Sequence, residues 1–217
     1  MLLAADLLFR AAELENLQVL MVLASDGGVG KELDALTRSA DALGIHPPTA
    51  RVGPGEAEAA LGGLVDVHVT PRGTQRERRP SGTVIAVGPV RRPGATSQDA
   101  AARLADPLAV RLALMMIPAD EEADLTDEAL ARAGETLMDW RRRVAEWAQS
   151  PSRPVPANLA DAVRVAFGDL DTVSLIALID DLAADDGVPS GARFETFLYA
   201  DRVLGLELPR DIGRLSV

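Results

Sequence analysis

The residues best placed to bind a ligand follow a short apolar run. Residues 18–24 read QVLMVLA, and a glycine-rich segment with a lysine follows them. Glycine leaves backbone N–H groups accessible, and at the start of a helix these groups can face an anion. The candidate ligand- or nucleotide-binding residues are Asp26, Gly27, Gly28, Gly30 and Lys31.

This glycine segment is not a Walker A loop. The first glycine of that motif is missing, and Glu32 replaces the Ser or Thr that should follow the lysine. The alternative interpretation is a strand-to-helix turn in which glycine provides positive φ angles. Both interpretations remain open from the sequence.

Arginines form the second candidate site. Six of them lie between residues 72 and 92, against a single acid, Glu77. They are candidate phosphate or RNA contacts: Arg72, Arg76, Arg78, Arg79, Arg91 and Arg92. No aromatic residue lies among them to stack on a base, and the chain carries a net charge of −11. A solvated, charged loop is the alternative, and the acidic total disfavours non-specific RNA binding.

Metal and nucleophile chemistry find little support. The chain has no cysteine and two histidines, His46 and His68, so we predict no metal and no zinc site. We interpret both histidines as structural. No Ser–His–Asp arrangement is visible, and we assign no catalytic residue. Trp140 and Trp147 are predicted to be core residues, and the acids at 120–127 and 180–186 to be solvated.

The elements of the N-terminal half alternate between helix and strand. Hydrophobic periodicity predicts helices over 2–15, 31–43 and 56–61 and strands over 18–24, 65–69 and 83–87, with 70–82 as a loop or hairpin tip. An apolar strand followed by a glycine loop and a helix is typical of a doubly wound α/β unit.

The C-terminal half is predicted to be helical throughout. Helices are expected at 98–104, 107–117, 126–147, 158–167, 172–182 and from 190, with Thr126, Asn158, Thr172 and Ser190 as N-caps. One helix carries a buried seam at spacings of three and four: Leu130, Ala133, Leu137, Trp140, Val144 and Trp147. The predicted fold class is therefore α/β, with a reduced Rossmann-like domain over 1–105 and an all-α helical bundle over 106–217.

The composition also bounds the location. No apolar run is long enough to span a bilayer, and Met1 to Asp6 lack the basic flank of a secretory signal. We expect a cytoplasmic protein without a membrane partner.

Several segments in the right order resemble one family. Residues 5–14 with 17–19 are similar to the helix and strand that follow the HIGH motif of that family. Ser25–Lys31 lies where the family has TDVDDK, and Ala42–Thr49 is similar to its ALGxxPP turn. Asp106–Leu114 resembles a DPxAxRLALL helix, residues 168–172 a DDLNTP turn, and residues 202–206 a terminal RVLGL. The family is that of the class I cysteinyl-tRNA synthetases and the cysteine ligase of mycothiol biosynthesis.

The departures from that family determine the functional expectation. The resemblance places Met1 downstream of the HIGH motif, whose histidines stabilise the phosphate during adenylate formation. It places the KMSKS loop at residues 90–97, which contain Arg91 and Arg92 but no lysine. The family holds cysteine through a thiolate-bound zinc, and this chain has no thiol. We expect a pseudo-enzyme that binds or regulates, with ATP binding left open.

Two other classes remain as alternatives. One is a working cysteine ligase that uses an altered route or a partner chain. The other is a tRNA- or RNA-binding module that uses the arginines and the bundle. For the binding or regulatory pseudo-enzyme, we expect an unidentified protein partner or a homo-oligomer. The sequence does not show which partner this is.

Overall fold

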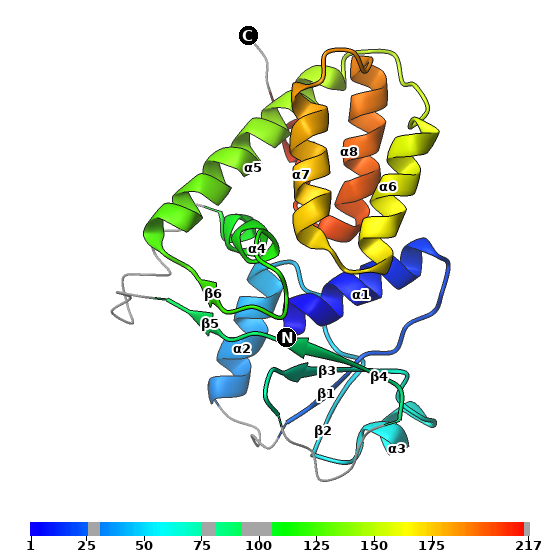
Figure 1. The fold of residues 1–217 in the computed structure, drawn as a ribbon. Coiled ribbons are helices and arrows are strands. Elements are labelled where there is room, and N and C mark those ends of the chain that lie inside the picture. The colour runs from blue at the N-terminus through cyan, green and yellow to red at the C-terminus, as the bar shows by residue number, and fades with distance from the viewer. Residues whose placement is uncertain (26–30, 75–80, 93–105, 215–217) are drawn as a thin grey trace. The chain divides into compact units, whose positions relative to one another are not determined.

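The computed structural model describes residues 1–25, 31–74, 81–92 and 106–214, and it divides into two compact units. The first unit comprises Met1–Arg91 with Ala119–Ala123, and the second comprises Arg92–Pro118 with Asp124–Val217. The mixed α/β architecture with small parallel sheets and a helical region confirms the predicted fold class (Figure 1). The predicted domain boundary at residue 105 lies outside the described residues and stays a prediction.

The first unit contains one βαβ motif, which follows an N-terminal helix. Helix α1 (Leu2–Leu14) precedes strand β1 (Val22–Ala24), helix α2 (Lys31–Ala42) and strand β2 (Ala50–Val52). The two strands are parallel, with Val22 opposite Ala50, so α2 is the crossover between them. Strand β1 is shorter than the apolar run that predicted it, and Leu20 remains 52% exposed.

The second pair of strands corrects one prediction. After α3 (Ala57–Leu61), strands β3 (Val67–Pro71) and β4 (Thr83–Val87) pair in parallel. The N–H of Thr83 donates to the carbonyl of Asp66 at their N-terminal ends, and the N–H of Arg72 donates to the carbonyl of Val87 at their C-terminal ends. A hairpin over residues 70–82 would make the strands antiparallel, so the hairpin alternative is wrong.

Little of the first unit is buried. Its buried side chains among the described residues are Ala4, Asp6, Leu7, Ile45, Thr70 and Ala123. Parallel sheets are usually covered on both faces. Here Val67 and Val84, which point to opposite faces of the β3–β4 pair, are 40% and 47% exposed. The short strands β5 (Val90–Arg91) and β6 (Ala123–Asp124) pair separately.

The second unit is a packed set of helices. It contains α4 (Pro107–Met115), α5 (Asp127–Trp147), α6 (Ala157–Gly168), α7 (Thr172–Ala184), α8 (Ser190–Leu204) and the 3₁₀ turn η1 (Leu208–Asp211). The whole predicted seam of α5 is buried, and Phe197 of α8 packs edge-on against both Trp140 and Trp147. The helix predicted at 98–104 lies outside the described residues.

The N-caps agree with prediction at one helix out of four. Thr126 caps α5, its hydroxyl accepting from the N–H of Ala129. Helices α6 and α8 begin after Pro156 and Pro189, so Asn158 and Ser190 already lie inside them. Asp171 caps α7 in place of Thr172, whose hydroxyl donates to the carbonyl of Met115 instead. Those three predicted caps are wrong because each helix has its N-cap one or two residues earlier. Pro156 and Pro189 occupy that position in α6 and α8, and the carboxylate of Asp171 is the side-chain acceptor in α7.

Among the described residues, no helix combines the length and apolar character needed to cross a bilayer.

Candidate functional site

The glycine-rich segment joins a strand to a helix. Strand β1 ends at Ala24, and the N–H of Ser25 still donates to the carbonyl of Val52 on β2. Helix α2 begins at Lys31. Asp26, Gly27, Gly28 and Gly30 lie outside the described residues, so their role as ligand contacts stays a prediction.

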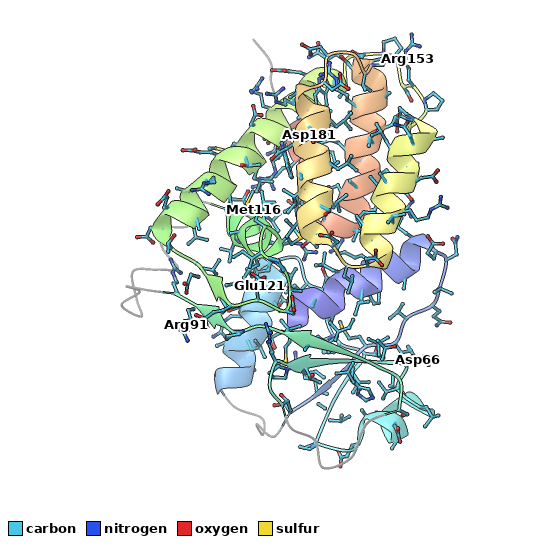
Figure 2. All side chains as sticks on the ribbon, in the orientation of Figure 1. Asp66, Arg91, Met116, Glu121, Arg153 and Asp181 are labelled. Atoms are coloured by element: carbon cyan, nitrogen blue, oxygen red, sulfur yellow. The ribbon has the colours of Figure 1, made fainter. Side chains whose placement is uncertain are left out.

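Two of the predicted phosphate-binding arginines contact the protein itself. Nη1 of Arg72 donates to the carbonyl of Asp120 at 2.7 Å, and Nε of Arg91 lies 2.9 Å from Oε1 of Glu122. Figure 2 shows Arg91 and the neighbouring Glu121 among the side chains of this region. The arginines therefore hold the 119–123 segment. Arg76, Arg78 and Arg79 lie outside the described residues.

Backbone contacts complete the attachment of this segment. The N–H of Gly88 donates to the carbonyl of Ala119, and the N–H of Ala123 donates to the carbonyl of Pro89. A Cβ at Gly88 would lie 1.7 Å from the carbonyl oxygen of Glu121, so the close approach requires glycine. Segment 119–123 is thus fixed beside β4 and β5 of the first unit.

A polar cluster that sequence reasoning missed joins α1 to the turn after α2. Asp6 is fully buried. Its carboxylate accepts from Nε of Arg10 at 2.9 Å and from the backbone N–H of His46 at 2.9 Å. Nδ1 of His46 lies 2.6 Å from Oδ1 of Asp6. Arg10 also donates to the carbonyl of Gly44.

This geometry fixes the state of the imidazole ring. A carboxylate can only accept hydrogen bonds, so Nδ1 of His46 must be the protonated nitrogen. In the neutral ring, Nε2 is then the acceptor and potential base. The ring of Phe9 stacks against the imidazole with centroids 4.5 Å apart. The side chain of His46 is nevertheless 36% exposed.

His46 lines a shallow groove of the first unit. Its volume is ≈ 20 Å³, about the room of one water molecule. Its walls come from the start of α1, from β1, α2 and β2, and from the turn at residues 45–48. Arg51 of β2 reaches across it, donating to the hydroxyl of Thr37 on α2 at 2.8 Å. Apolar side chains such as Leu23 and Ile45 form much of its lining, with His46 and Arg51 among the polar residues.

One sequence signal could have pointed to this cluster. Asp6 stands among Leu3, Leu7 and Arg10 on the apolar face of a predicted helix, and a buried acid needs a partner. Its second partner, His46, lies forty residues away, and only the folded chain brings the two together.

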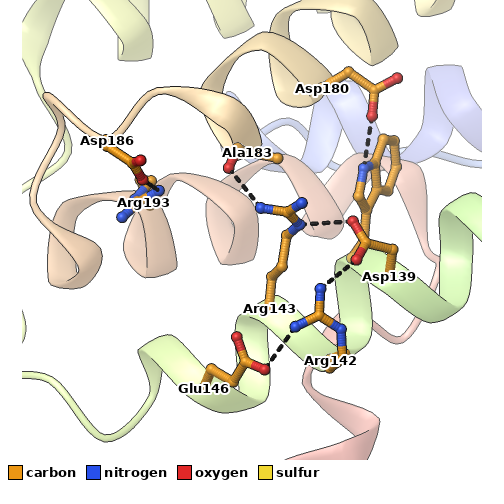
Figure 3. A network of polar contacts seen from close by, with 9 residues as sticks. Asp139, Arg142, Arg143, Glu146, Asp180, Ala183, Asp186 and Arg193 are labelled. Carbon is orange, nitrogen blue, oxygen red and sulfur yellow. Dashed lines mark hydrogen bonds and ion pairs between the residues drawn. The ribbon is translucent and has the colours of Figure 1, made fainter.

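The helical unit contains a polar cluster of its own. Arg142 bridges Asp139 and Glu146 along α5, while Arg143 contacts Asp139 and the carbonyl of Ala183 (Figure 3). Desolvation opposes ionisation of Asp139, but hydrogen bonds from Arg143 and Arg142 outweigh it, so the pKa of Asp139 is lowered. The contact of Arg143 with Ala183 joins α5 to α7, while the other ion pairs lie along α5 itself.

Among the described residues, no three His, Cys, Asp or Glu side chains lie together in a way that could hold a metal ion. That the chain binds no metal stays a prediction.

Comparison with known proteins gives one family. The chain is 36% identical over 110 residues to the L-cysteine:1D-myo-inositol 2-amino-2-deoxy-alpha-D-glucopyranoside ligase of Acidothermus cellulolyticus, covering 51% of this chain and 27% of the ligase. The ligase of the same name from Streptomyces griseus is 32% identical over 132 residues, covering 58% and 29%. That of Thermobispora bispora is 36% identical over 105 residues, covering 48% and 25%.

No family model matches the chain. The chain spans about a quarter of the length of the curated relatives that it matches. These relatives confirm the resemblance that the motifs indicated. Over about half of its residues, the chain is similar to these cysteine ligases.

Proposed function

We propose that this chain is a synthetase-like binding or regulatory protein that does not form an aminoacyl adenylate by itself. The observation that carries the proposal is the use of Arg91. The resemblance places this residue at the start of the loop that grips the phosphates. Here its guanidinium is paired with Glu122 and holds a neighbouring segment.

The chemistry of the loop supports the same proposal. Residues 90–97 contain no lysine, and an arginine does not reproduce the flexible reach of a lysine ammonium. The absence of cysteine removes thiolate ligands for a zinc that could select a thiol substrate. Electrostatic groups of this kind each supply about 3 kcal/mol or more of transition-state stabilisation. We therefore expect no adenylate chemistry from these residues.

The relatives suggest which ligands to test. Their names specify L-cysteine and a 2-amino-2-deoxy-glucopyranoside of myo-inositol as substrates. A binding protein of this ancestry is expected to retain affinity for one of these molecules or for ATP, with the 26–31 segment as the candidate contact. A cytoplasmic location remains part of the proposal.

ATP–pyrophosphate exchange tests the proposal directly. The purified chain is assayed with each of the twenty amino acids, with and without zinc, and the Acidothermus cellulolyticus ligase serves as positive control. We expect no exchange above the sample without amino acid. Exchange that depends on any amino acid would refute the proposal.

A second candidate is a ligase completed by another chain. The exposure of Val67 and Val84 on opposite faces of a parallel strand pair favours it, because a further polypeptide could cover that sheet. Co-expression with a synthetase, followed by the same exchange assay on the co-purified complex, tests it. Exchange equal to that of the synthetase alone would remove this candidate.

A further inference from the structure

We propose that the free edge of strand β4 pairs with the same strand of a second copy of this chain, around a two-fold axis at Ile85. Such a pairing goes beyond the proposed function, because it assigns a partner and a surface without any adenylate chemistry. It uses the edge of the β3–β4 pair and not its faces. Its tests therefore do not depend on the exchange assay.

The pairing of β4 with β3 engages every second residue of β4. The N–H of Thr83 donates to the carbonyl of Asp66 on the β3 side, so the odd-numbered residues of β4 face β3. Successive backbone N–H and C=O groups of a strand point to opposite edges. Val84 and Ala86 therefore direct theirs away from β3. Among the described residues, β3 is the one strand that pairs with β4, and these outward groups have no strand partner.

This edge has none of the features that commonly keep strand edges apart. Residues 83–87 read TVIAV, without a charge or a proline. The side chain of Val84 is 47% exposed, and Ala86 is also exposed. The outer edge of β3 differs, because it ends in Pro71, which has no N–H to donate. The edge of β4 is therefore the one open to a further strand.

A second copy satisfies this edge in one register. When the two strands run antiparallel around an axis at Ile85, Val84 of each copy lies opposite Ala86 of the other. Each of these pairs exchanges two hydrogen bonds, so every outward-facing group of both residues finds a partner. The two Ile85 residues then face each other between the hydrogen-bonded pairs. The product is a four-stranded sheet, whereas a pair of strands alone is marginally stable.

An acidic segment lies at one end of the free edge. The N–H of Gly88 points outward and donates to the carbonyl of Ala119, so the chain from Ala119 onward continues this side of β4. Asp120 and Glu121 follow directly and are exposed, and Figure 2 labels Glu121. Among the described residues, neither carboxylate forms an ion pair. A strand that pairs with β4 is therefore favoured when positive charge stands at this end.

The sequence of a second copy has that charge in the required place. In an antiparallel pair, the chain that precedes β4 of one copy runs toward the acidic segment of the other. Arg78 and Arg79 precede Thr83 by five and four residues in the sequence, although both lie outside the described part of the chain. Residues 83–87 themselves carry no charge, so the two strands do not repel each other. The charge pattern thus favours self-pairing in the antiparallel direction.

Sedimentation equilibrium measures the association. We expect a reversible dimer with a dissociation constant above about 10 µM, because strands of this length bury less surface than a stable complex does. Val84→Pro should abolish the dimer, since it removes an outward N–H and leaves the bonds to β3 in place. Val67→Pro is the matched control: it removes an outward N–H from the opposite edge and should dimerise like the parent. Circular dichroism checks that both variants are folded.

A cysteine cross-link tests the register. The chain has no cysteine, so Ile85→Cys places a single thiol at the two-fold axis. Opposite Cα atoms in a pair without hydrogen bonds lie about 4.5 Å apart, which a disulfide can span. Copper phenanthroline serves as the oxidant that takes up the two electrons, and two protons are released. Ile85→Cys should form a linked dimer, while Val67→Cys, also at an exposed position, should remain largely monomeric.

A charge reversal tests the acidic end of the edge. Glu121→Lys should raise the dissociation constant by about tenfold, because two symmetry-related contacts change sign. Glu15→Lys, at an exposed position at the end of α1, makes the same change in net charge and should leave the dissociation constant unchanged. Added salt should weaken the parent dimer and narrow the difference between the parent and Glu121→Lys.

Four results would overturn the proposal. The first is a chain that stays monomeric up to about 1 mM. The second is a dimer that Val84→Pro, correctly folded, leaves intact, since another surface would then form it. The third is equal cross-linking of Ile85→Cys and Val67→Cys. The last is an edge that pairs only with a co-expressed synthetase, because a different polypeptide would then be its partner.

Discussion

Two buried arginines, Arg111 and Arg141, donate to backbone carbonyls in the helical unit. Arg111 is fully buried and donates to the carbonyl of Leu204. Arg141 pairs with Asp106 and donates to the carbonyls of Leu206 and Glu207. Buried cations persist only when such partners are in place. Arg111 therefore attaches the last residue of α8 to α4, and Arg141 attaches the chain just after α8 to α5.

Arg141→Ala should be strongly destabilising. The change leaves the carboxylate of Asp106 without its main partner and two backbone carbonyls without donors, which typically costs about 3–5 kcal/mol. Urea unfolding followed by tryptophan fluorescence measures the loss. The neighbouring Arg142→Ala is the matched control, because its ion pairs are exposed and should contribute less than about 1 kcal/mol. Equal losses in the two variants would contradict the assignment.

Asp106 should make stability depend on pH in the acidic range. Burial raises its pKa, but hydrogen bonds from Arg141 and Leu108 outweigh burial, and the net pKa is lowered. A lowered folded pKa means that the carboxylate stabilises the fold above its unfolded value, about 3.9. This contribution is lost as pH falls through the folded value.

The variant Asp106→Asn tests this sign. Asparagine remains a competent N-cap for α4 but carries no titrating charge. The difference in unfolding free energy between the parent and the variant should be constant near neutral pH and shrink below about pH 4. Urea titrations at a series of pH values measure it. A difference that stays constant through the acidic range would argue against the ion pair.

At the scale of elements, two helical glycines differ sharply in their surroundings. Gly191 lies in the first turn of α8, where a Cβ would come within 2.0 Å of the carbonyl oxygen of Pro151. Gly168 ends α6, and a Cβ there would meet nothing within 4 Å. The first glycine lets the linker before α6 approach α8, while the second has no such role.

Gly191→Ala should therefore lower stability and Gly168→Ala should not. The clash with a backbone carbonyl forces the linker or the helix to shift, at a cost of about 1–3 kcal/mol. Alanine at Gly168 is expected to be neutral or to stabilise by up to about 1 kcal/mol. Thermal unfolding of both variants provides the comparison. A neutral Gly191→Ala would show that the linker does not pack as closely as described.

On the scale of the whole molecule, the two units differ in how much they bury. The helical unit buries a continuous set of large side chains, including Trp140, Phe197 and Ile179. In the first unit, buried side chains are few, and its strands retain exposed valines. Local stability follows buried apolar contact, so the two units should open at different free energies.

Hydrogen exchange followed by mass spectrometry should resolve this difference. Amides of α5 and α8 should be protected most strongly, approaching the free energy of global unfolding. Amides of β1–β2 and β3–β4 should exchange markedly faster under the same conditions. Uniform protection across both units would contradict the expectation and indicate a single cooperative fold.

The success of the sequence predictions also varies with scale. The seam of α5 was predictable because a period of 3.6 residues is a local property, and Trp140, Val144 and Trp147 are all buried as expected. The caps of α6, α7 and α8 were not, because Pro156, Asp171 and Pro189 compete with the predicted residues one or two positions away.

The candidate sites show the same limit. The glycine-rich segment was found from composition alone, and its contacts stay predictions. The arginine prediction did not anticipate that Arg72 and Arg91 would hold residues 120 and 122, because those partners lie at least thirty residues further along the chain. The Asp6–His46 pair was missed for the same reason.

The sequence by itself determined helices α1 to α8, strands β1, β3 and β4, the apolar faces and the resemblance to the cysteine ligases, since these are written in local patterns and motifs. The short strands β2, β5 and β6 were not predicted. Only the tertiary structure decided that β3 and β4 are parallel, which arginines are engaged and that an imidazole is fixed beside a groove. These depend on contacts between distant residues, and such contacts form only when the chain folds and buried polar groups must find partners.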